Sequence, residues 1–242
     1  STLTGSNVIT LPDTVTELTN YANQKCNGQD AVTLQTAFAL SCNTAFVEMS
    51  EQLGADELRK YAKAFGVGEN YDLGVSTSAG TLGDLPDGAA TAQSAIGQRD
   101  VTMTALQAAV MAGTVANKGT RMQPYLVNRI TDAQMKDIRT TKPKKADQAV
   151  NEETAATLTD LMYASERSSA GYDGNGFASK TGTAEHGEGL APHVWYVAFD
   201  PERDIAVGVV VKNGGNLGES ATGGKVSGPI GRAILRAYQG EQ

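Results

Sequence analysis

Two short stretches of the sequence combine residue types that could bind and activate a carbonyl substrate. The first is Ser179-Lys180-Thr181-Gly182-Thr183, where a cation, hydroxyls and a glycine follow one another in a strand-like run. An extended peptide could pair along such a strand while Lys and Thr donors hold its terminal carboxylate. The second is Ser41-Cys42-Asn43, which separates two apolar stripes of helical spacing. Its hydroxyl and amide could pass a proton and hold a substrate amide in a cleft.

Each stretch taken alone can also be explained by a purely structural role. Lys, Thr and Gly are common in surface hairpins, and Ser41 and Asn43 could simply cap the helix expected to begin near Thr44. Together, in this order and on these elements, the stretches match the second and third motifs of the serine acyl-transferase set S-x-x-K, S-D-N and K-T-G.

Further strings extend the match over nearly the whole chain. They are 94–98 (SAIGQ), 104–107 (TALQ) with 116–119 (ANKG), 180–187 with 193–196 (HVWY), and 221–224 (ATGG). With them the chain resembles the transpeptidase domain of class B penicillin-binding proteins, and is most like the actinobacterial penicillin-binding protein A group. Cys42 departs from the Asp or Ser usual at the middle of the second motif, a change that the family tolerates.

The first motif of the set is missing from the sequence. No Ser is followed three residues later by Lys, and Ser1 and Ser6 are rejected as nucleophiles because neither has a Lys to take its proton. In the family the nucleophilic Ser and its Lys lie on a helix N-terminal to Ser41. We therefore expect an N-terminally truncated domain that cannot acylate by itself. The missing helix should be a buried element of the fold, so its absence should expose a large apolar face. We expect the isolated chain to be poorly stable or to retain a noncovalent N-terminal fragment.

The resemblance implies a role for each matched motif residue. The catalytic residues are Ser41, Asn43 and Lys180, and the substrate-binding residues are Thr181, Gly182 and Thr183. In the parent enzyme the missing Ser attacks the penultimate D-Ala carbonyl, Ser41 relays a proton to the departing amine, and Asn43 orients the substrate amide. Lys180 supplies positive charge, the two threonines bind the terminal carboxylate, and the Thr183 N–H forms part of the oxyanion hole.

The implied function is a D,D-transpeptidase that cross-links peptidoglycan stem peptides ending in D-Ala-D-Ala and that binds β-lactam antibiotics. Such an enzyme serves cell wall biogenesis, in cell shape or division, at the extracytoplasmic face of the bacterial plasma membrane, and its anchor would lie in a segment absent from this chain. Neither a cofactor nor a metal is implied, because acyl transfer with an internal base needs none.

A D,D-carboxypeptidase and a degenerate, non-catalytic scaffold domain remain alternatives, although the intact second and third motifs disfavour the scaffold. A class A β-lactamase is disfavoured because residues 44–179 contain no Glu-x-x-Leu-Asn.

The cysteines and histidines have two interpretations each. Cys26 and Cys42, 16 residues apart, could form a disulfide in an exported protein or remain two buried thiols, and we favour the disulfide.

His186 and His193 are expected to be loop residues at the cleft mouth rather than metal ligands, because zinc sites recruit about three or four protein ligands. Glu185 either shapes the cleft entrance or is a solvated carboxylate.

The elements that must position these residues indicate an α+β fold. We expect one domain over 1–242, with a helical part at about 31–119 and a sheet-forming part at about 121–242. A first helical segment is expected from Val32 onward, with Leu34, Ala37 and Phe38 as its apolar stripe. Further expected helices are 44–53, 56–65, 104–117, 151–166 with Asn151 as cap, and 228–238. Expected strands are 125–130, 176–185, 194–199 and 205–211, the last three forming an antiparallel meander in which Trp195 and Tyr196 pack a core strand. Residues 67–100 and 142–146 are expected to be loops, and the first thirty residues to be turn-rich with a strand-like stretch only at 9–11.

Composition narrows the function classes further. The 242 residues are 40% hydrophobic and 19% charged, which suits a folded domain with a core and excludes a disordered chain. The charge balance is 20 − 27 = −7 without a basic cluster, so nucleic acid is not an expected partner. No apolar run approaches the roughly 20 residues that span a bilayer.

Overall fold

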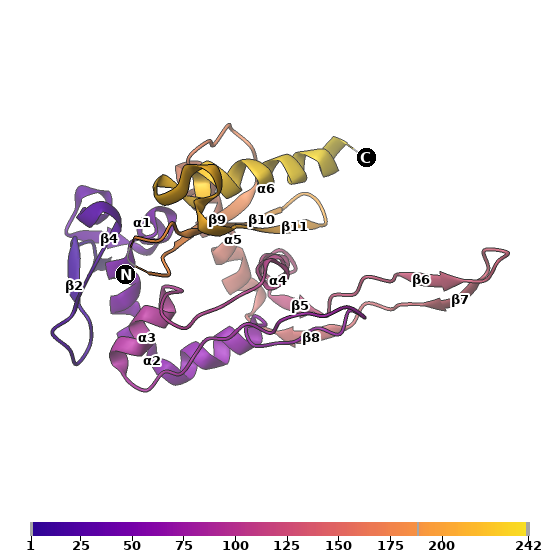
Figure 1. Cartoon of the computed structure of the whole chain (residues 1–242), viewed down its shortest axis with the longest axis horizontal. Coiled ribbons are helices and arrows are strands. Elements are labelled where there is room, and N and C mark those ends of the chain that lie inside the picture. Colours follow the sequence, from indigo (N-terminus) through magenta and orange to yellow (C-terminus); the bar gives the residue numbers. More distant parts are fainter. Residues whose placement is uncertain (1, 188, 241–242) are drawn as a thin grey trace.

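The computed structural model describes residues 2–187 and 189–240, so Ser1 lies outside the described part (Figure 1). The α-helices are α1 (Leu34–Leu40), α2 (Asn43–Ala64), α3 (Gly88–Ala95), α4 (Ala105–Ala116), α5 (Glu152–Ser168) and α6 (Gly223–Gly240). The short 3-10 segments are η1 (Tyr21–Asn23), η2 (Cys26–Gly28) and η3 (Lys212–Ser220). The strands are β1 (Thr2–Thr4), β2 (Val8–Thr10), β3 (Glu17–Thr19), β4 (Ala31–Thr33), β5 (Thr120–Met122), β6 (Arg129–Thr131), β7 (Asp137–Thr140), β8 (Lys145–Gln148), β9 (Ala178–Ala184), β10 (His193–Asp200) and β11 (Ile205–Val211).

An antiparallel sheet of order β11-β10-β9 forms the centre of the fold, as the meander predicted. Alternation along the strands sends Ser179, Ala198 and Val207 to one face and Lys180, Val197 and Gly208 to the other. Helix α6 packs on the first face and α4 on the second, which gives the predicted α+β layering (Figure 1).

Glycines let both covering helices come close to the sheet. A Cβ on Gly208 would collide with the backbone of α4, and a Cβ on Gly231 of α6 would collide with the ring of Tyr196. Tyr196 is fully buried beneath α6, as expected of a core strand residue, and Trp195 on the opposite face is partly buried. Burial of an aromatic side chain of this kind stabilises the fold by about 1.5–3 kcal/mol.

Several predicted helix signals are confirmed. Helix α5 begins after Asn151, whose side chain accepts the N–H of Thr154 at 2.7 Å, and Glu152 lies in its first turn. Helix α2 is interrupted at Gly54, where φ is 77° and ψ is 164°, so the expected division into two helical segments is present inside one assigned element.

Other predicted elements are wrong. Residues 67–100 are not a continuous loop, because α3 lies within them and Asp87 caps it by accepting the N–H of Ala90 at 2.7 Å. This helix is short and buries small residues, so it has no long apolar stripe to reveal it. The strand expected at 125–130 begins only at Arg129, and the preceding apolar residues connect two separate two-stranded ribbons. The expected basic loop at 142–146 ends in strand β8. The turn-rich start contains three short strands, β1, β2 and β3, where only the stretch at 9–11 was expected.

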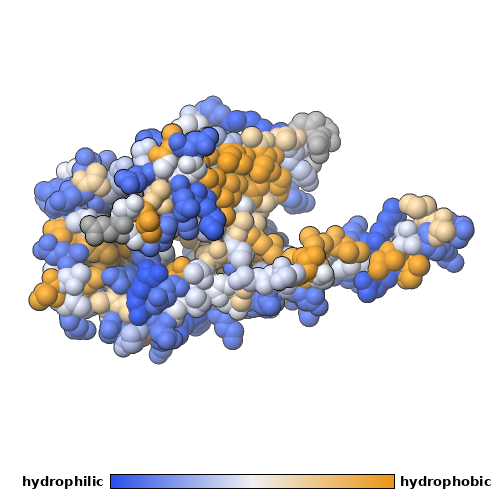
Figure 2. Space-filling model, in the orientation of Figure 1, coloured by the Kyte–Doolittle hydropathy of each residue, from blue (hydrophilic) through white to orange (hydrophobic). Residues whose placement is uncertain are grey.

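Exposed apolar side chains gather in several places rather than on one face. The ribbon of β6 and β7 projects from the body of the molecule and exposes apolar residues along its length (Figures 1 and 2). These residues are Tyr125, Leu126, Val127, Ile130, Met135 and Ile138. Ile230 and Ile234 are exposed on α6. Within residues 2–187 and 189–240, no helix combines the length and the hydropathy required to cross a bilayer.

Candidate active site

Ser41 occupies the tight connection between α1 and α2. Its backbone is left-handed, with φ 57° and ψ 49°, and its N–H donates to the carbonyls of Ala37 and Phe38 at the end of α1. Few residues other than glycine adopt this conformation, and those that do are common at functional sites. The turn leaves Ser41 exposed at the end of α1.

Neither Ser41 nor Asn43 caps helix α2, so the capping explanation of this motif is wrong. The N-cap is Cys42, whose side chain makes no capping hydrogen bond. The N-terminal end of α2 is satisfied instead by Asn20, whose Oδ1 accepts the N–H of the buried Thr44 at 3.1 Å. The Asn20 amide also donates to the carbonyl of Ser6 at 2.9 Å, which locks the cap in place. The motif side chains are thereby left for the cleft.

Replacing Asn20 with Ala should lower the free energy of unfolding by about 1–2 kcal/mol, because the buried helix end loses its acceptor. The matched control is Asn7→Ala, which removes only a hydrogen bond to Asn23 at the surface and should cost less than about 0.5 kcal/mol. Urea unfolding of the two variants makes the comparison. Equal losses in both variants would show that Asn20 is not the cap.

A disulfide joins Cys26 in η2 to Cys42, with 5.7 Å between the Cα atoms. Both residues are buried in an apolar cluster that includes Val32 and Ala37. The structure therefore contains the bridge that we favoured over two thiols. It fastens the central residue of the Ser41–Asn43 turn to the N-terminal segment of the chain.

The two sequence motifs meet at Lys180. Its ammonium donates a hydrogen bond to Ser41 Oγ across 139 residues of sequence, and a second one to the carbonyl of Thr181 at 2.8 Å. The ring of Phe38 lies beneath it, with 5.8 Å from Nζ to the ring centroid. Phe38 was identified in the sequence only as part of an apolar stripe, and its helical position one turn before Ser41 explains why it reaches the site.

Asn43 begins the first turn of α2, two residues after Ser41. Its side-chain amide donates to the carbonyl of Thr19 at the end of β3, at 3.0 Å. This bond fixes the orientation of the amide from outside its own helix. The structure thus places Ser41 and Lys180 in direct contact, whereas the amide of Asn43, two residues further along, bonds to Thr19 rather than to either of them.

The substrate-binding candidates continue along β9 from Lys180. In the described part of the chain β9 pairs only with β10, so its second edge is free for an extended peptide. The side-chain hydroxyls of Thr181 and Thr183 are partly exposed and make no hydrogen bond with another described residue. Between them, the Gly182 backbone lies against Gly223, the first residue of α6, whose missing side chain permits this approach because a Cβ there would collide with Gly182.

Burial lowers the pKa of Lys180 from its ordinary value of 10.5 to about 8. Because the ammonium ion is desolvated, the neutral amine is favoured in the folded state. The unfolded chain then binds more protons than the folded chain between about pH 8 and 10.5. The contribution of this group therefore makes the folded state more stable as the pH rises through that window.

NMR titration of the chain with 13C-labelled lysine should detect one side chain that titrates near pH 8. Lys180→Arg identifies that signal by its disappearance. Lys60 and Lys118 are internal controls, because hydrogen bonds to Glu57 and Glu152 raise their pKa above 10.5. A Lys180 signal that titrates with the controls would contradict the buried position of the ammonium.

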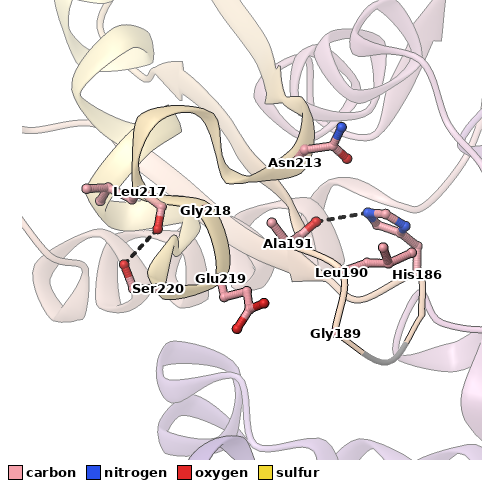
Figure 3. A pocket seen from close by; sticks show the side chains of 9 residues that line it. All are labelled: His186, Gly189, Leu190, Ala191, Asn213, Leu217, Gly218, Glu219 and Ser220. Atoms are coloured by element: carbon pink, nitrogen blue, oxygen red, sulfur yellow. Dashed lines mark hydrogen bonds between the residues drawn. The ribbon is translucent and has the colours of Figure 1, made fainter.

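Two open hollows lie at the carboxyl end of β9. One of about 580 Å³ is lined by Arg99, Glu185, His186 and Gly187, so Glu185 lies at a hollow beyond the end of β9. The other, of about 720 Å³, lies between the loop after β9 and η3, as Figure 3 shows.

His186 lines both hollows, in the loop where it was expected. His193 is not a loop residue as expected but the first residue of strand β10, and it lines neither hollow. The rings of His186 and His193 stack with 4.1 Å between centroids, and His186 Nε2 lies 2.9 Å from the carbonyl oxygen of Ala191. His193 Nδ1 accepts the N–H of Asn213 at 3.1 Å, and its pKa is lowered by burial, His186 and Lys212. No group of three or more metal-ligating side chains is present among the described residues.

Comparisons with known proteins identify the family of the chain. The family model of the penicillin binding protein transpeptidase domain matches residues 2–236. The peptidoglycan D,D-transpeptidase PbpA of Mycolicibacterium smegmatis is 44% identical over 236 residues, covering 94% of this chain and 48% of the relative. PbpA of Mycobacterium tuberculosis is 41% identical over 249 residues, covering 99% of this chain and 50% of the relative. The chain thus spans about half the length of these relatives.

Superposition on solved structures points to the same family. Penicillin-binding protein A from M. tuberculosis, as its ceftriaxone acyl-enzyme, superposes with a TM-score of 0.93 at 41% identity, covering 98% of this chain and 55% of that chain. The penicillin G acyl-enzyme of the same protein gives a TM-score of 0.92 at 41% identity, covering 99% of this chain and 56% of that chain. The D,D-transpeptidase domain from Eggerthella lenta, at 23% identity and a TM-score of 0.82, shares the fold. With its family match over nearly the whole length, its Ser41 beside Lys180 and these superpositions, the chain belongs to the penicillin-binding protein transpeptidase family.

Proposed function

We propose that this chain supplies the second and third catalytic motifs of a peptidoglycan D,D-transpeptidase whose nucleophile comes from a segment outside it. The observation that carries the proposal is the hydrogen bond from Lys180 to Ser41, made beside the free edge of β9. A proton-relay hydroxyl, a cation and an open strand edge are the parts that an acyl-transfer site needs around its nucleophile.

The donor peptide binds as an added strand along β9, with its terminal carboxylate between the hydroxyls of Thr181 and Thr183. The nucleophilic serine of the missing motif forms a bond to the carbonyl carbon of the penultimate D-Ala. The bond from that carbon to the terminal D-Ala nitrogen breaks, and the serine proton passes through Ser41 to the departing amine. An amine of a neighbouring stem peptide then bonds to the acyl carbon. The ester bond to the serine oxygen breaks, and a proton of the amine returns to that oxygen.

Lys180 lies where its electrostatic effect on this proton path is largest. Its ammonium donates to Ser41 Oγ, which leaves the Ser41 proton directed toward the departing amine. With a pKa of about 8 the group is still mainly the charged ammonium at neutral pH, but small changes in the bound state can shift its protonation. The two neighbouring hollows give the remaining residues of the stem peptide space beyond Thr183.

β-Lactams are the second ligand class that we propose. The solved relatives include acyl-enzyme complexes of penicillin-binding protein A from M. tuberculosis with ceftriaxone, imipenem and penicillin G. A β-lactam carries a carboxylate next to its reactive carbonyl, so the threonine hydroxyls that hold the peptide carboxylate can also hold the drug.

We further propose that the parent protein is a class B enzyme held at the extracytoplasmic face of the plasma membrane by a segment outside this chain. The disulfide between Cys26 and Cys42 supports an oxidising compartment. The exposed apolar groups on the β6–β7 ribbon and on α6 offer surface that such a segment could cover.

Product analysis separates the transpeptidase from its alternatives. The parent protein is incubated with a pentapeptide ending in D-Ala-D-Ala, with and without an acceptor amine, and the products are identified by mass spectrometry. We expect a product in which the acceptor replaces the terminal D-Ala. A product shortened by D-Ala alone, even with excess acceptor, would identify a carboxypeptidase, and an unchanged peptide would identify a non-catalytic scaffold.

A further inference from the structure

A buried charged cluster lies directly behind the catalytic strand and has no part in the proposed chemistry. Because side chains alternate along β9, Ser179 points away from the face that carries Lys180. Ser179 is completely buried, and its hydroxyl donates to Oε2 of Glu166 on α5. The residue that precedes the catalytic lysine is thus fastened to a buried carboxylate.

Glu166 collects hydrogen bonds from several elements at once. Its Oε2 also accepts from the Tyr196 hydroxyl of β10 at 2.9 Å. Its Oε1 accepts from Arg232 Nε of α6 at 2.7 Å and from the Asn175 amide, before β9, at 2.9 Å. We call Glu166, Ser179, Tyr196, Arg232 and Asn175 the Glu166 cluster.

The two charged side chains of the cluster, Glu166 and Arg232, are buried and have hydrogen-bond partners. The side chains of Glu166 and Arg232 are 1% and 2% exposed. The remaining Arg232 nitrogens donate to the carbonyl of Ala170 at 3.0 Å and to Ser169 Oγ at 3.1 Å. Burial by itself raises the pKa of Glu166, but the hydrogen bonds from Arg232, Ser179 and Asn175 together outweigh it, so the net pKa lies below the ordinary value. The carboxylate is therefore ionised at neutral pH.

Stability alone does not account for such a cluster. A buried ion pair contributes little more to folding than well-packed apolar side chains of the same volume, because desolvation offsets the attraction. Hydrogen bonds differ from apolar contacts in being directional, so they fix the position of the groups they join. The Glu166 cluster joins α5, β9, β10 and α6 at one point, one residue from Lys180.

We propose that Glu166 and Arg232 are positioning residues for the acyl-transfer reaction, which set the place of Lys180 relative to Ser41 by holding Ser179. This inference rests on the proposed function of the site. The lysine reaches Ser41 from β9, whereas Ser41 stands on the α1–α2 turn, so a displacement of β9 changes their separation directly. A misplacement of about 1 Å in a catalytic group can cost about 10²-fold in rate.

Ser179→Ala is the primary test, because it cuts the link to β9 while Glu166 keeps its bonds from Tyr196, Asn175 and Arg232. In the parent protein, this variant and Glu166→Gln should be acylated by penicillin at least about tenfold more slowly than the wild type. In the isolated chain, the Lys180 signal should titrate at higher pH than in the wild type, toward 10.5, because water reaches the displaced ammonium.

Two arginine variants provide the matched control for a general loss of stability. Arg232→Met removes the buried arginine of the cluster. Arg121→Met removes an equally buried arginine that bonds the carbonyl of Ala64 at 2.8 Å and pairs with Glu69, away from β9. Both should unfold at lower temperature. Well below that temperature, only Arg232→Met should show slower acylation and a shifted Lys180 titration.

The outcomes separate this inference from the proposed function. The positioning role is overturned if Ser179→Ala and Glu166→Gln keep the wild-type acylation rate and the wild-type Lys180 titration. A wild-type parent that penicillin does not acylate at all would contradict the proposed function. The titration in the isolated chain would then still decide whether the cluster positions Lys180.

Discussion

Lys180→Ala in the parent protein is expected to lower the second-order rate constant of acylation by penicillin by about 10²–10⁴-fold. The variant removes the cation that contacts the Ser41 hydroxyl, and a positioned group on a proton-transfer path contributes about this factor. Ser41 itself should remain in its turn, because its backbone bonds to Ala37 and Phe38 do not involve the lysine. The loss should therefore appear in the rate and not in the amount of folded protein.

The rate is measured with a fluorescent penicillin, and circular dichroism reports the fold of each variant. Lys144→Ala, at an exposed position next to strand β8, is the matched control for loss of one lysine and should react at the wild-type rate. Lys180→Arg keeps a positive charge but cannot be neutralised, and it should be slower than the wild type. A Lys180→Ala rate within about threefold of the wild type would remove this lysine from the catalytic group.

Removing the disulfide by the double substitution Cys26→Ser and Cys42→Ser should lower the free energy of unfolding by about 3 kcal/mol. The bridge closes a loop with a sequence separation of 16, and this is the loss expected for a loop of that size. For a chain of this length, the loss corresponds to a fall in melting temperature of roughly 6–12 °C. In the parent protein, acylation should also slow, because Cys42 lies between Ser41 and Asn43.

Reduction of the wild-type chain provides the control for this prediction. Dithiothreitol should lower the melting temperature of the wild type and leave that of the double variant unchanged. The bridge itself is checked on non-reducing gels and by thiol titration with Ellman's reagent. Two titratable thiols in unfolded, unreduced protein, together with unchanged migration on the gels, would show that the bridge does not form.

The parts of the site that the sequence revealed are those carried by short contiguous motifs. Ser41, Asn43 and the run from Lys180 to Thr183 could be identified because each motif keeps its chemistry within a few residues. The meander of β9, β10 and β11 and the Asn151 cap were equally local signals. The family resemblance predicted that Ser41 and Lys180 share one site, but their direct contact is known only from the structure, since no local rule joins residues so far apart in the chain.

The parts that the sequence did not reveal depend on contacts between distant segments. Asn20 caps a helix that begins more than twenty residues later, and nothing around Asn20 indicates this. Glu166 stands in the last turns of an amphipathic helix, where a solvated glutamate is the ordinary expectation, and only the packing of α6 brings Arg232 to it. Helix α3 was missed because its buried residues are small and polar or small and apolar.

The most direct test of a divided catalytic site is intact mass spectrometry of the 25.3 kDa chain and of its parent protein, each with and without excess penicillin. The chain holds Ser41, Asn43 and Lys180 but no Ser-x-x-Lys motif, so it should keep its mass. The parent protein should gain the mass of one drug molecule, on a peptide outside residues 1–242. A drug adduct on the 25.3 kDa chain itself would contradict the division of the site, because the nucleophile would then lie within this sequence.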